Sequence, residues 1–173
     1  MRYVLTLIAT VLLGSSAYAA DAGPTLSLDG FGPLKFGMPA DQSLAVLHHE
    51  MPYNLAASGR CKQLSLPQFE AAGLSFVLEQ QKLVRIDIDF NTGKRETSAR
   101  TDTDIGLGSP EADVRKAYPG AKIKSNPADP AWHTITVETP DHSRGLVFET
   151  NGETVKTIRG GLREAITSEE GCN

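Results

Sequence analysis

The chain has 173 residues, 40% of them hydrophobic, and a formal net charge of −4 at pH 7. This length fits one or two small domains with a real core, and no low-complexity tract indicates disorder. The acidic balance and the lack of a basic patch argue against nucleic acid and anionic lipid as partners.

The N-terminus has the pattern of a secretory signal peptide. Arg2 precedes an apolar run over residues 4–13, and Ala17 and Ala19 form a small-x-small cleavage site. The apolar run is shorter than the ~20 residues that a membrane-spanning helix needs. We therefore expect removal of residues 1–19, no stable membrane insertion afterwards, and a periplasmic or secreted protein.

The first predicted helix follows a short polar lead-in at residues 20–30. Gly37-Met38-Pro39 indicates a turn into this helix, because glycine allows the turn and proline suits the first helical turn. Leu44 and Leu47 then share one helical face. Pro52 is expected to end the helix.

Three strands are predicted after this helix, over residues 61–66, 73–79 and 82–90. The third strand alternates between apolar and charged side chains, which therefore point to opposite faces of a sheet. The apolar set is Val84, Ile86, Ile88 and Phe90, and the charged set is Arg85, Asp87 and Asp89. A polar linker over residues 91–103 follows.

The second half repeats this order of elements. Ser109 suits a helix N-cap, Pro110 the first helical position, and Pro119-Gly120 stops the helix. Asn151-Gly152 is a strong hairpin-turn signal. Strands are predicted over residues 132–138, 145–150 and 155–160.

The two halves carry matching short motifs. Gly73-Leu74-Ser75-Phe76 is echoed by Gly145-Leu146-Val147-Phe148, and Gly37-Met38-Pro39 by Gly108-Ser109-Pro110, at offsets of 71 to 72 positions. We predict an α+β fold of two tandem repeats, at residues 20–90 and 104–173. Each repeat is a short helical segment packed on a three- to four-stranded antiparallel sheet. The helix covers the apolar sheet face, and the other face is polar and open.

These motifs resemble a known repeat. A Gly-x-Pro turn into a helix, then Gly-Leu-x-Phe and Val-x-x-Ile on a hairpin, is similar to the helix-plus-sheet module of the β-lactamase-inhibitor-protein fold. Single-copy versions occur in small outer-membrane assembly lipoproteins of the BamE type. The resemblance spans roughly residues 33–90 and 104–172. It implies helices on one sheet face and another protein bound on the other.

Cys61 and Cys172 are the two cysteines of the chain. An even cysteine count in an exported protein is typical of a structural disulfide, which we predict here. The alternative is a reactive thiol, but neither cysteine has a histidine close in sequence.

A search for catalytic and metal-binding motifs leaves two weak candidates. His48-His49-Glu50 invites a metal interpretation, but adjacent helical histidines point about 100° apart and converge poorly on one ion. Asp87 and Asp89 share a strand face and fit a carboxylate-based hydrolase or a calcium site, but a solvated sheet face accounts for them more simply. We therefore predict no metal, no cofactor and no enzymatic activity.

The predicted outward sheet face is the candidate binding surface. Trp132 either anchors a partner there or tucks under the linker, and the sequence favours neither. The candidate binding residues are Arg85, Asp87, Asp89, Trp132, Glu149, Thr157 and Arg159. We expect an inhibitor-like module that binds another exported or envelope protein. The alternatives are an accessory assembly factor of the cell envelope and a cell-wall hydrolase.

Overall fold

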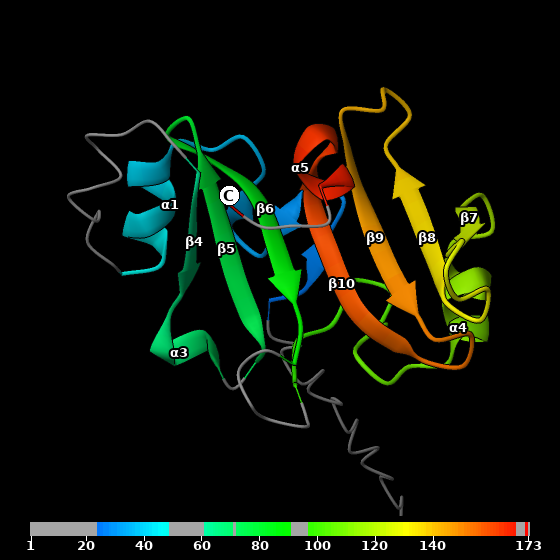
Figure 1. Ribbon diagram of the computed structural model, residues 1–173. Coiled ribbons are helices and arrows are strands. Elements are labelled where there is room, and N and C mark those ends of the chain that lie inside the picture. The colour runs from blue at the N-terminus through cyan, green and yellow to red at the C-terminus, as the bar shows by residue number, and fades with distance from the viewer. Residues whose placement is uncertain (1–23, 49–60, 71, 91–96, 169–171, 173) are drawn as a thin grey trace, which may run out of the picture.

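The computed structural model describes residues 24–48, 61–70, 72–90, 97–168 and 172. The predicted signal peptide, the metal candidates His49 and Glu50, Pro52 and the first part of the predicted linker lie outside these ranges. The fold is α+β with antiparallel sheets, as predicted (Figure 1).

The six predicted strands and one that was not predicted, β7, form a seven-stranded antiparallel sheet in the order β4-β5-β6-β10-β9-β8-β7. The last strand of each half, β6 and β10, pair at its centre. In chain order the strands are β4 (Lys62–Ser65), β5 (Leu74–Glu79), β6 (Lys82–Ile88), β7 (Lys122–Ser125), β8 (His133–Glu138), β9 (Arg144–Thr150) and β10 (Val155–Leu162).

A separate three-stranded sheet lies near the N-terminus. It consists of β1 (Leu26–Ser27), β2 (Gly30–Phe31) and β3 (Leu34–Lys35). The prediction of a polar lead-in over residues 20–30 is wrong at β1, because Leu26 is buried in the core, as is Phe31 just beyond the predicted segment. These apolar side chains are too few to give a periodic pattern, so the sequence did not reveal the strands.

The described helices are α1 (Ala40–Val46), α3 (Pro67–Glu70), α4 (Glu111–Ala117) and α5 (Arg163–Thr167). The two predicted helices, α1 and α4, are present. Ser109 does not cap α4, because its hydroxyl accepts a hydrogen bond from Gly106 N–H and Pro110 holds the N-cap position. Helix α1 ends at Val46, well before Pro52.

The same backbone hydrogen bond fixes the turn before each predicted helix. Gly37 N–H donates to the carbonyl of Leu83 at 2.7 Å, and Gly108 N–H donates to the carbonyl of Val155 at 2.9 Å. Both glycines have positive φ, 85° and 80° respectively, a backbone conformation that glycine adopts without strain. Each turn thereby attaches its helix to the hairpin of its own half.

The hydrophobic core lies on one side of the seven-stranded sheet, where α1, α3, α4 and the small sheet cover it. Phe76 and Phe148 are fully buried there. The ring of Phe76 meets Phe69 of α3 at 5.3 Å between centroids, and the ring of Phe148 meets Tyr118 at the end of α4 at 5.4 Å. We call this side of the sheet the helix face.

The predicted alternation along β6 is correct at its centre and wrong at its ends. Ile86 and Ile88 belong to the core cluster. Val84 is buried but lines a hollow beside α5, because the β5–β6 register shifts between Val77 and Leu78. Phe90 lies beyond the end of β6 and is 38% exposed.

Gly160 and Gly161 in β10 lie where neighbouring segments pack closely against the strand. A Cβ atom on Gly160 would lie 2.9 Å from Leu26 Cδ1, and one on Gly161 would lie 2.4 Å from the carbonyl oxygen of Val84. The central β6–β10 pairing therefore depends on glycine.

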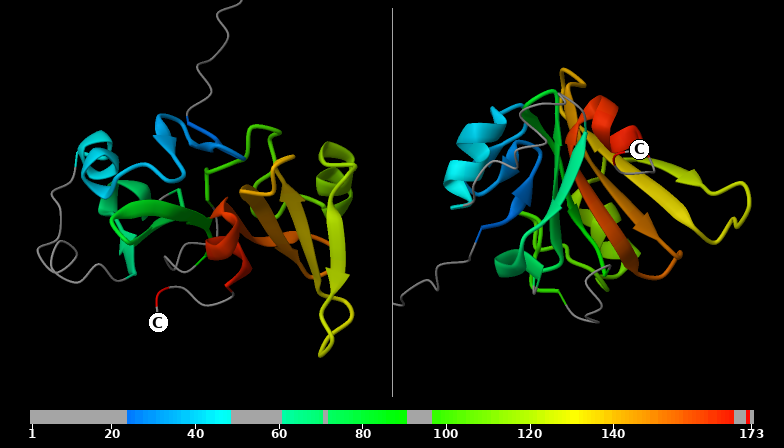
Figure 2. Two further views of the ribbon diagram at one scale, coloured as in Figure 1. Left: turned by 90° about the horizontal axis from the view of Figure 1, so that it is seen from above. Right: turned by 60° about the vertical axis from the view of Figure 1, so that its left-hand side comes forward.

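Helix α5 crosses the sheet on the side opposite α1 and α4 (Figure 2). We call this side the second face, and we call residues 163–168 the C-terminal strap. The prediction that this face is open is wrong for the area under the strap, where Arg85, Asp87 and Arg159 are only 4%, 6% and 7% exposed. None of the described helices is long and apolar enough to cross a membrane.

Candidate functional site

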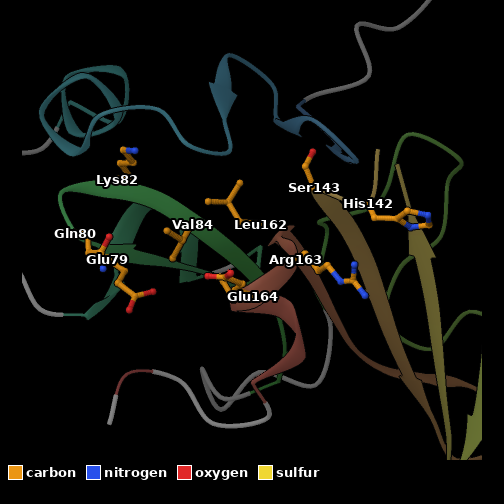
Figure 3. A pocket seen from close by; sticks show the side chains of 10 residues that line it. Glu79, Gln80, Lys82, Val84, His142, Ser143, Leu162, Arg163 and Glu164 are labelled. Atoms are coloured by element: carbon orange, nitrogen blue, oxygen red, sulfur yellow. The ribbon is translucent and has the colours of Figure 1, made fainter. Parts of the chain in front are cut away.

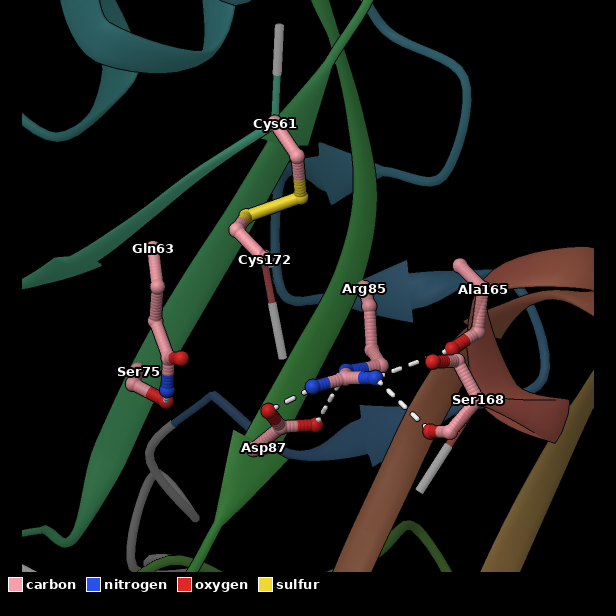
Figure 4. Close-up of a disulfide and its surroundings, with 8 residues drawn as sticks. All are labelled: Cys61, Gln63, Ser75, Arg85, Asp87, Ala165, Ser168 and Cys172. Carbon is pink, nitrogen blue, oxygen red and sulfur yellow. Dashed lines mark hydrogen bonds and ion pairs between the residues drawn. A yellow bond between two sulfur atoms is a disulfide. The ribbon is translucent and has the colours of Figure 1, made fainter. Parts of the chain in front are cut away.

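The charged residues under the strap form a compact cluster (Figure 4). Arg85 Nε lies 2.9 Å from Asp87 Oδ1. The Arg85 guanidinium also donates to the backbone carbonyls of Ala165 at 3.0 Å and Ser168 at 3.2 Å, and Arg159 donates to the same Ser168 carbonyl at 3.0 Å. The two arginines therefore bind the strap through its main chain. The cluster holds the strap on the sheet without the help of a partner.

Burial changes the acidity of Asp87. Desolvation raises the pKa of this carboxyl to about 6, while the neighbouring guanidinium of Arg85 limits the rise. Both Asp87 and Arg85 are covered by protein, so neither offers a side chain to a ligand in this state. Asp89, the other member of the predicted carboxylate pair, is half-buried just beyond β6.

The strap is followed by the predicted disulfide, which is present. Cys61 and Cys172 are bonded, with their Cα atoms 5.1 Å apart. Because Cys61 directly precedes β4, the bond fastens the C-terminal end to the edge of the sheet opposite β7. It thereby closes a loop over a sequence separation of 111 residues.

The uncovered part of the second face is a groove over the other end of the sheet, with a volume of about 380 Å³. Strands β7 to β10 provide its floor and α5 one of its sides. We call it the β7–β10 groove. Its lining residues are Lys122, Lys124, Thr134, Thr136, Glu138, Val147, Glu149, Arg159, Arg163, Ile166 and Thr167.

Glu138 is surrounded by nitrogen-bearing side chains at one side of the groove. Its carboxylate accepts from Lys122 Nζ at 2.6 Å and lies 3.0 Å from His142 Nδ1 and 3.6 Å from Arg163 Nε. Hydrogen bonds from Lys122 and His142 lower the pKa of Glu138. This carboxylate is therefore ionised at neutral pH and acts as a hydrogen-bond acceptor.

Glu149 organises the part of the groove nearest the strap. Its carboxylate pairs with Arg159 and accepts a hydrogen bond from Thr157 at 3.0 Å. These three residues were all predicted as binding residues, and the structure brings them together on neighbouring strands β9 and β10. Glu149 and Arg159 line the groove, although Arg159 is mostly covered.

Trp132 lies just before β8 and is 39% exposed. Alternation along β8 places His133 on the helix face, where its Nδ1 lies 2.7 Å from Glu111 Oε2 of α4. Thr134 and Thr136, at alternate positions of the same strand, line the groove on the opposite face. Trp132 is thus a large exposed apolar residue at the end of the strand that forms the groove floor.

Sequence reasoning missed Lys122, Lys124, Glu138 and Arg163. Strand β7 is four residues long with one apolar side chain, Ile123, so its pattern was too weak to recognise. The alternation of lysines around Ile123 was the available signal, because it places both lysines on one face.

A second hollow of about 400 Å³ adjoins the groove and shares Arg163 with it (Figure 3). Its side chains come from the β5–β6 hairpin, from the β8–β9 loop and from the start of α5. Glu79 and Lys82 lie on the hairpin side, and Arg163 on the opposite side. The charges are spread around the rim and do not converge on one point.

Metal-ligand side chains do not gather in threes anywhere in the described ranges. His48 is exposed beyond the end of α1. Comparisons of the chain with known protein families, curated proteins and solved structures found no match.

Proposed function

We propose that the protein is an exported, non-enzymatic binding module whose β7–β10 groove receives another protein. The observation that carries this proposal is the groove itself, a hollowed sheet face lined by charged and threonine side chains, together with the exposed Trp132 that directly precedes β8 of its floor. Aromatic anchors beside paired polar groups are typical of protein interfaces. The disulfide supports export, because such bonds persist in oxidising compartments.

A hydrolase has weaker support from the carboxylates. A glycosidase needs one carboxyl group that keeps its proton and reaches the substrate. Asp87 has the raised pKa, but the strap covers it. Glu138 faces the groove, but its pKa is lowered. The raised pKa and the access to the groove thus belong to different carboxyl groups, which favours binding over catalysis.

We also propose that the chain is a tandem repeat of the kind that its motifs resemble. Two further pairs of matched contacts support this. The first N–H of α1, from Ala40, donates to Gln81 in the hairpin turn at 2.8 Å, and that of α4, from Glu111, donates to Glu153 at 2.8 Å. Pro39 and Pro110 form isolated bridges with Lys82 and Thr154.

Affinity capture from an envelope extract, with and without a blocked groove, tests the binding proposal. Thr136→Tyr fills the groove floor with a residue that strands tolerate. Ala112→Tyr places the same side chain on exposed α4, on the opposite side of the sheet. We expect a stoichiometric partner for wild type and Ala112→Tyr, and its loss for Thr136→Tyr.

The anchor is tested once the partner is purified. Trp132→Ala should weaken binding by at least ~2 kcal/mol, because truncating an interface aromatic removes desolvated contact area. Calorimetry on the variant and on wild type measures this difference. Equal capture by all variants, together with unchanged affinity in Trp132→Ala, would exclude the groove as the interface.

A further inference from the structure

The β7–β10 groove has more positive than negative charge, in contrast to the chain as a whole. Its lining includes four cationic side chains and two carboxylates, whereas the chain carries a formal net charge of −4. Glu149 is paired with Arg159, and Glu138 with Lys122. Both carboxylates are therefore engaged, and the remaining charge on the groove is positive.

One lysine in the groove is available for a ligand. Lys124 is exposed, and within the part of the chain that the structure describes its side chain has no ion-pair or hydrogen-bond partner. Lys122 is 64% exposed and shares Glu138 with His142 and Arg163. A single carboxylate does not neutralise the two cations Lys122 and Arg163, so Lys122 also retains attraction for an incoming anion.

The spacing of the two lysines adds geometry to this charge. Lys122 and Lys124 are alternate residues of β7 and pair with Thr136 and Thr134 of β8, which line the same groove. Alternate side chains of a strand point to the same face and are ~7 Å apart along it. An extended peptide presents its own alternate side chains at the same interval. The groove therefore matches a chain with acidic groups at positions i and i+2.

We propose that the β7–β10 groove recognises an extended segment of a partner protein in which acidic residues alternate with small neutral ones. This inference rests on the proposed function and specifies its partner. The acidic side chains bind at Lys122 and Lys124, and the backbone between them lies over Thr134 and Thr136, whose hydroxyl groups can donate to its carbonyls. The alternating spacing gives selectivity, and the positive surplus accelerates association.

Two fluorescent peptides of identical composition test the spacing. In the first, two glutamates among threonines are two residues apart. In the second they are three residues apart, and so lie on opposite sides of an extended chain. Anisotropy titrations with the disulfide-bonded protein should give a Kd at least about fivefold lower for the first peptide. Equal affinity, or no binding of either peptide, would overturn the proposal.

Charge reversal at one lysine locates the binding. Lys124→Glu should raise the Kd of the first peptide at least about tenfold, and Lys124→Gln by a smaller factor. The matched control is Lys116→Glu, which makes the same charge change on exposed α4 and should alter the Kd by less than about twofold. Equal effects of the two reversals would indicate general attraction by net charge and contradict the proposal. Lys124 is exposed on an edge strand, and thermal melting verifies that the variants fold.

Other occupants of the groove give different results. If an anionic oligosaccharide or a single-stranded oligonucleotide binds as tightly as the first peptide and loses affinity equally in Lys124→Glu, the proposed ligand class is wrong. If the chain forms a dimer that Lys124→Glu dissociates, a second copy occupies the groove and the proposal also fails. Suppose that wild type captures a protein partner, that Thr136→Tyr loses it, and that neither peptide binds. This combination would contradict the present inference alone and leave the proposed function standing.

Discussion

Arg159 and Asp87 lie opposite each other where β10 pairs with β6, and both are buried although both are ionisable. Arg85 completes the cluster beside Asp87, and the strap covers all three. Taking charges out of water costs free energy that their mutual attraction offsets only in part. The junction between the two halves of the sheet is therefore the place where stability should respond to pH and to loss of the strap.

The raised pKa of Asp87 predicts a pH dependence of known sign. A carboxyl with a pKa of about 6 in the folded state and 3.8 as its ordinary value binds its proton more tightly when folded. Its contribution to stability is thus fully present below about pH 3.8 and is lost as the pH rises through about 6. Asp87→Asn removes this titration. The variant should therefore be more stable relative to wild type at pH 7.5 than at pH 4, by about 2 kcal/mol.

Urea unfolding of both proteins at the two pH values measures that difference. Asp41→Asn, on the exposed side of α1, serves as the control for removing a carboxylate that water surrounds. If Asp87→Asn differs from wild type by the same amount at both pH values, the burial of Asp87 does not govern its protonation.

Loss of the disulfide should destabilise the whole fold. Because the bond joins residues 111 positions apart, Cys172→Ser should lower the free energy of unfolding by roughly 4 to 5 kcal/mol on the chain-entropy account. Amides of α5 should also exchange faster with solvent, since the strap then has only its arginine contacts and local packing. Cys61→Ser and the double variant should lose the same amount, and a double variant markedly less stable than either single one would argue against a shared bond.

The close packing at the sheet centre predicts a large effect from a single methyl group. A Cβ on Gly161 would lie 2.4 Å from a backbone carbonyl of β6, which cannot move without breaking the pairing. Gly161→Ala should cost about 1 to 3 kcal/mol or more. Gly120→Ala is the matched control, because nothing lies within 4 Å of its added Cβ. Similar thermal stability of the two variants would refute the packing argument.

The β5–β6 hairpin turn offers a stabilising substitution. Gln80 and Gln81 both have positive φ, 47° and 60°, a conformation that costs most residues ~1 kcal/mol or more. Gln81→Gly should therefore raise the free energy of unfolding by up to about 1 kcal/mol. The same change at exposed Gln42 in α1 should lower it by about 1 kcal/mol. Chemical unfolding distinguishes the two, and a loss of stability in both would show that the turn is not strained.

Local sequence patterns predicted the elements that have their own signal. Glycine and proline marked the starts of α1 and α4, and alternation identified β8 and the centre of β6. Burial of Arg85 was not predictable in the same way, because its cover comes from Ala165 and Ser168, about 80 positions further along the chain. Alternation specifies which face a side chain points to, but the neighbours above that face are decided by tertiary packing.

The groove was only half predicted for a related reason. Glu149 and Arg159, which line the groove, belong to long, clearly patterned strands and were both identified, as was Thr157, which donates to Glu149. Lys122 and Lys124 belong to a four-residue edge strand whose pairing with β8 is a non-local feature. Short exposed strands have little apolar periodicity, so their contribution to a site becomes visible only in the folded chain.

Photo-crosslinking from within the groove tests the central proposal most directly. A benzoylphenylalanine at Thr136 reports what lies over the groove floor, and the same group at Ala112 reports what approaches the far side on α4. Each labelled protein is mixed with envelope extract and irradiated. Mass spectrometry then identifies the molecule that is crosslinked to it and the position of the crosslink. The account predicts one protein partner joined at position 136 and absent at position 112. Crosslinks at position 112 alone, or equal yields at both positions, would contradict it.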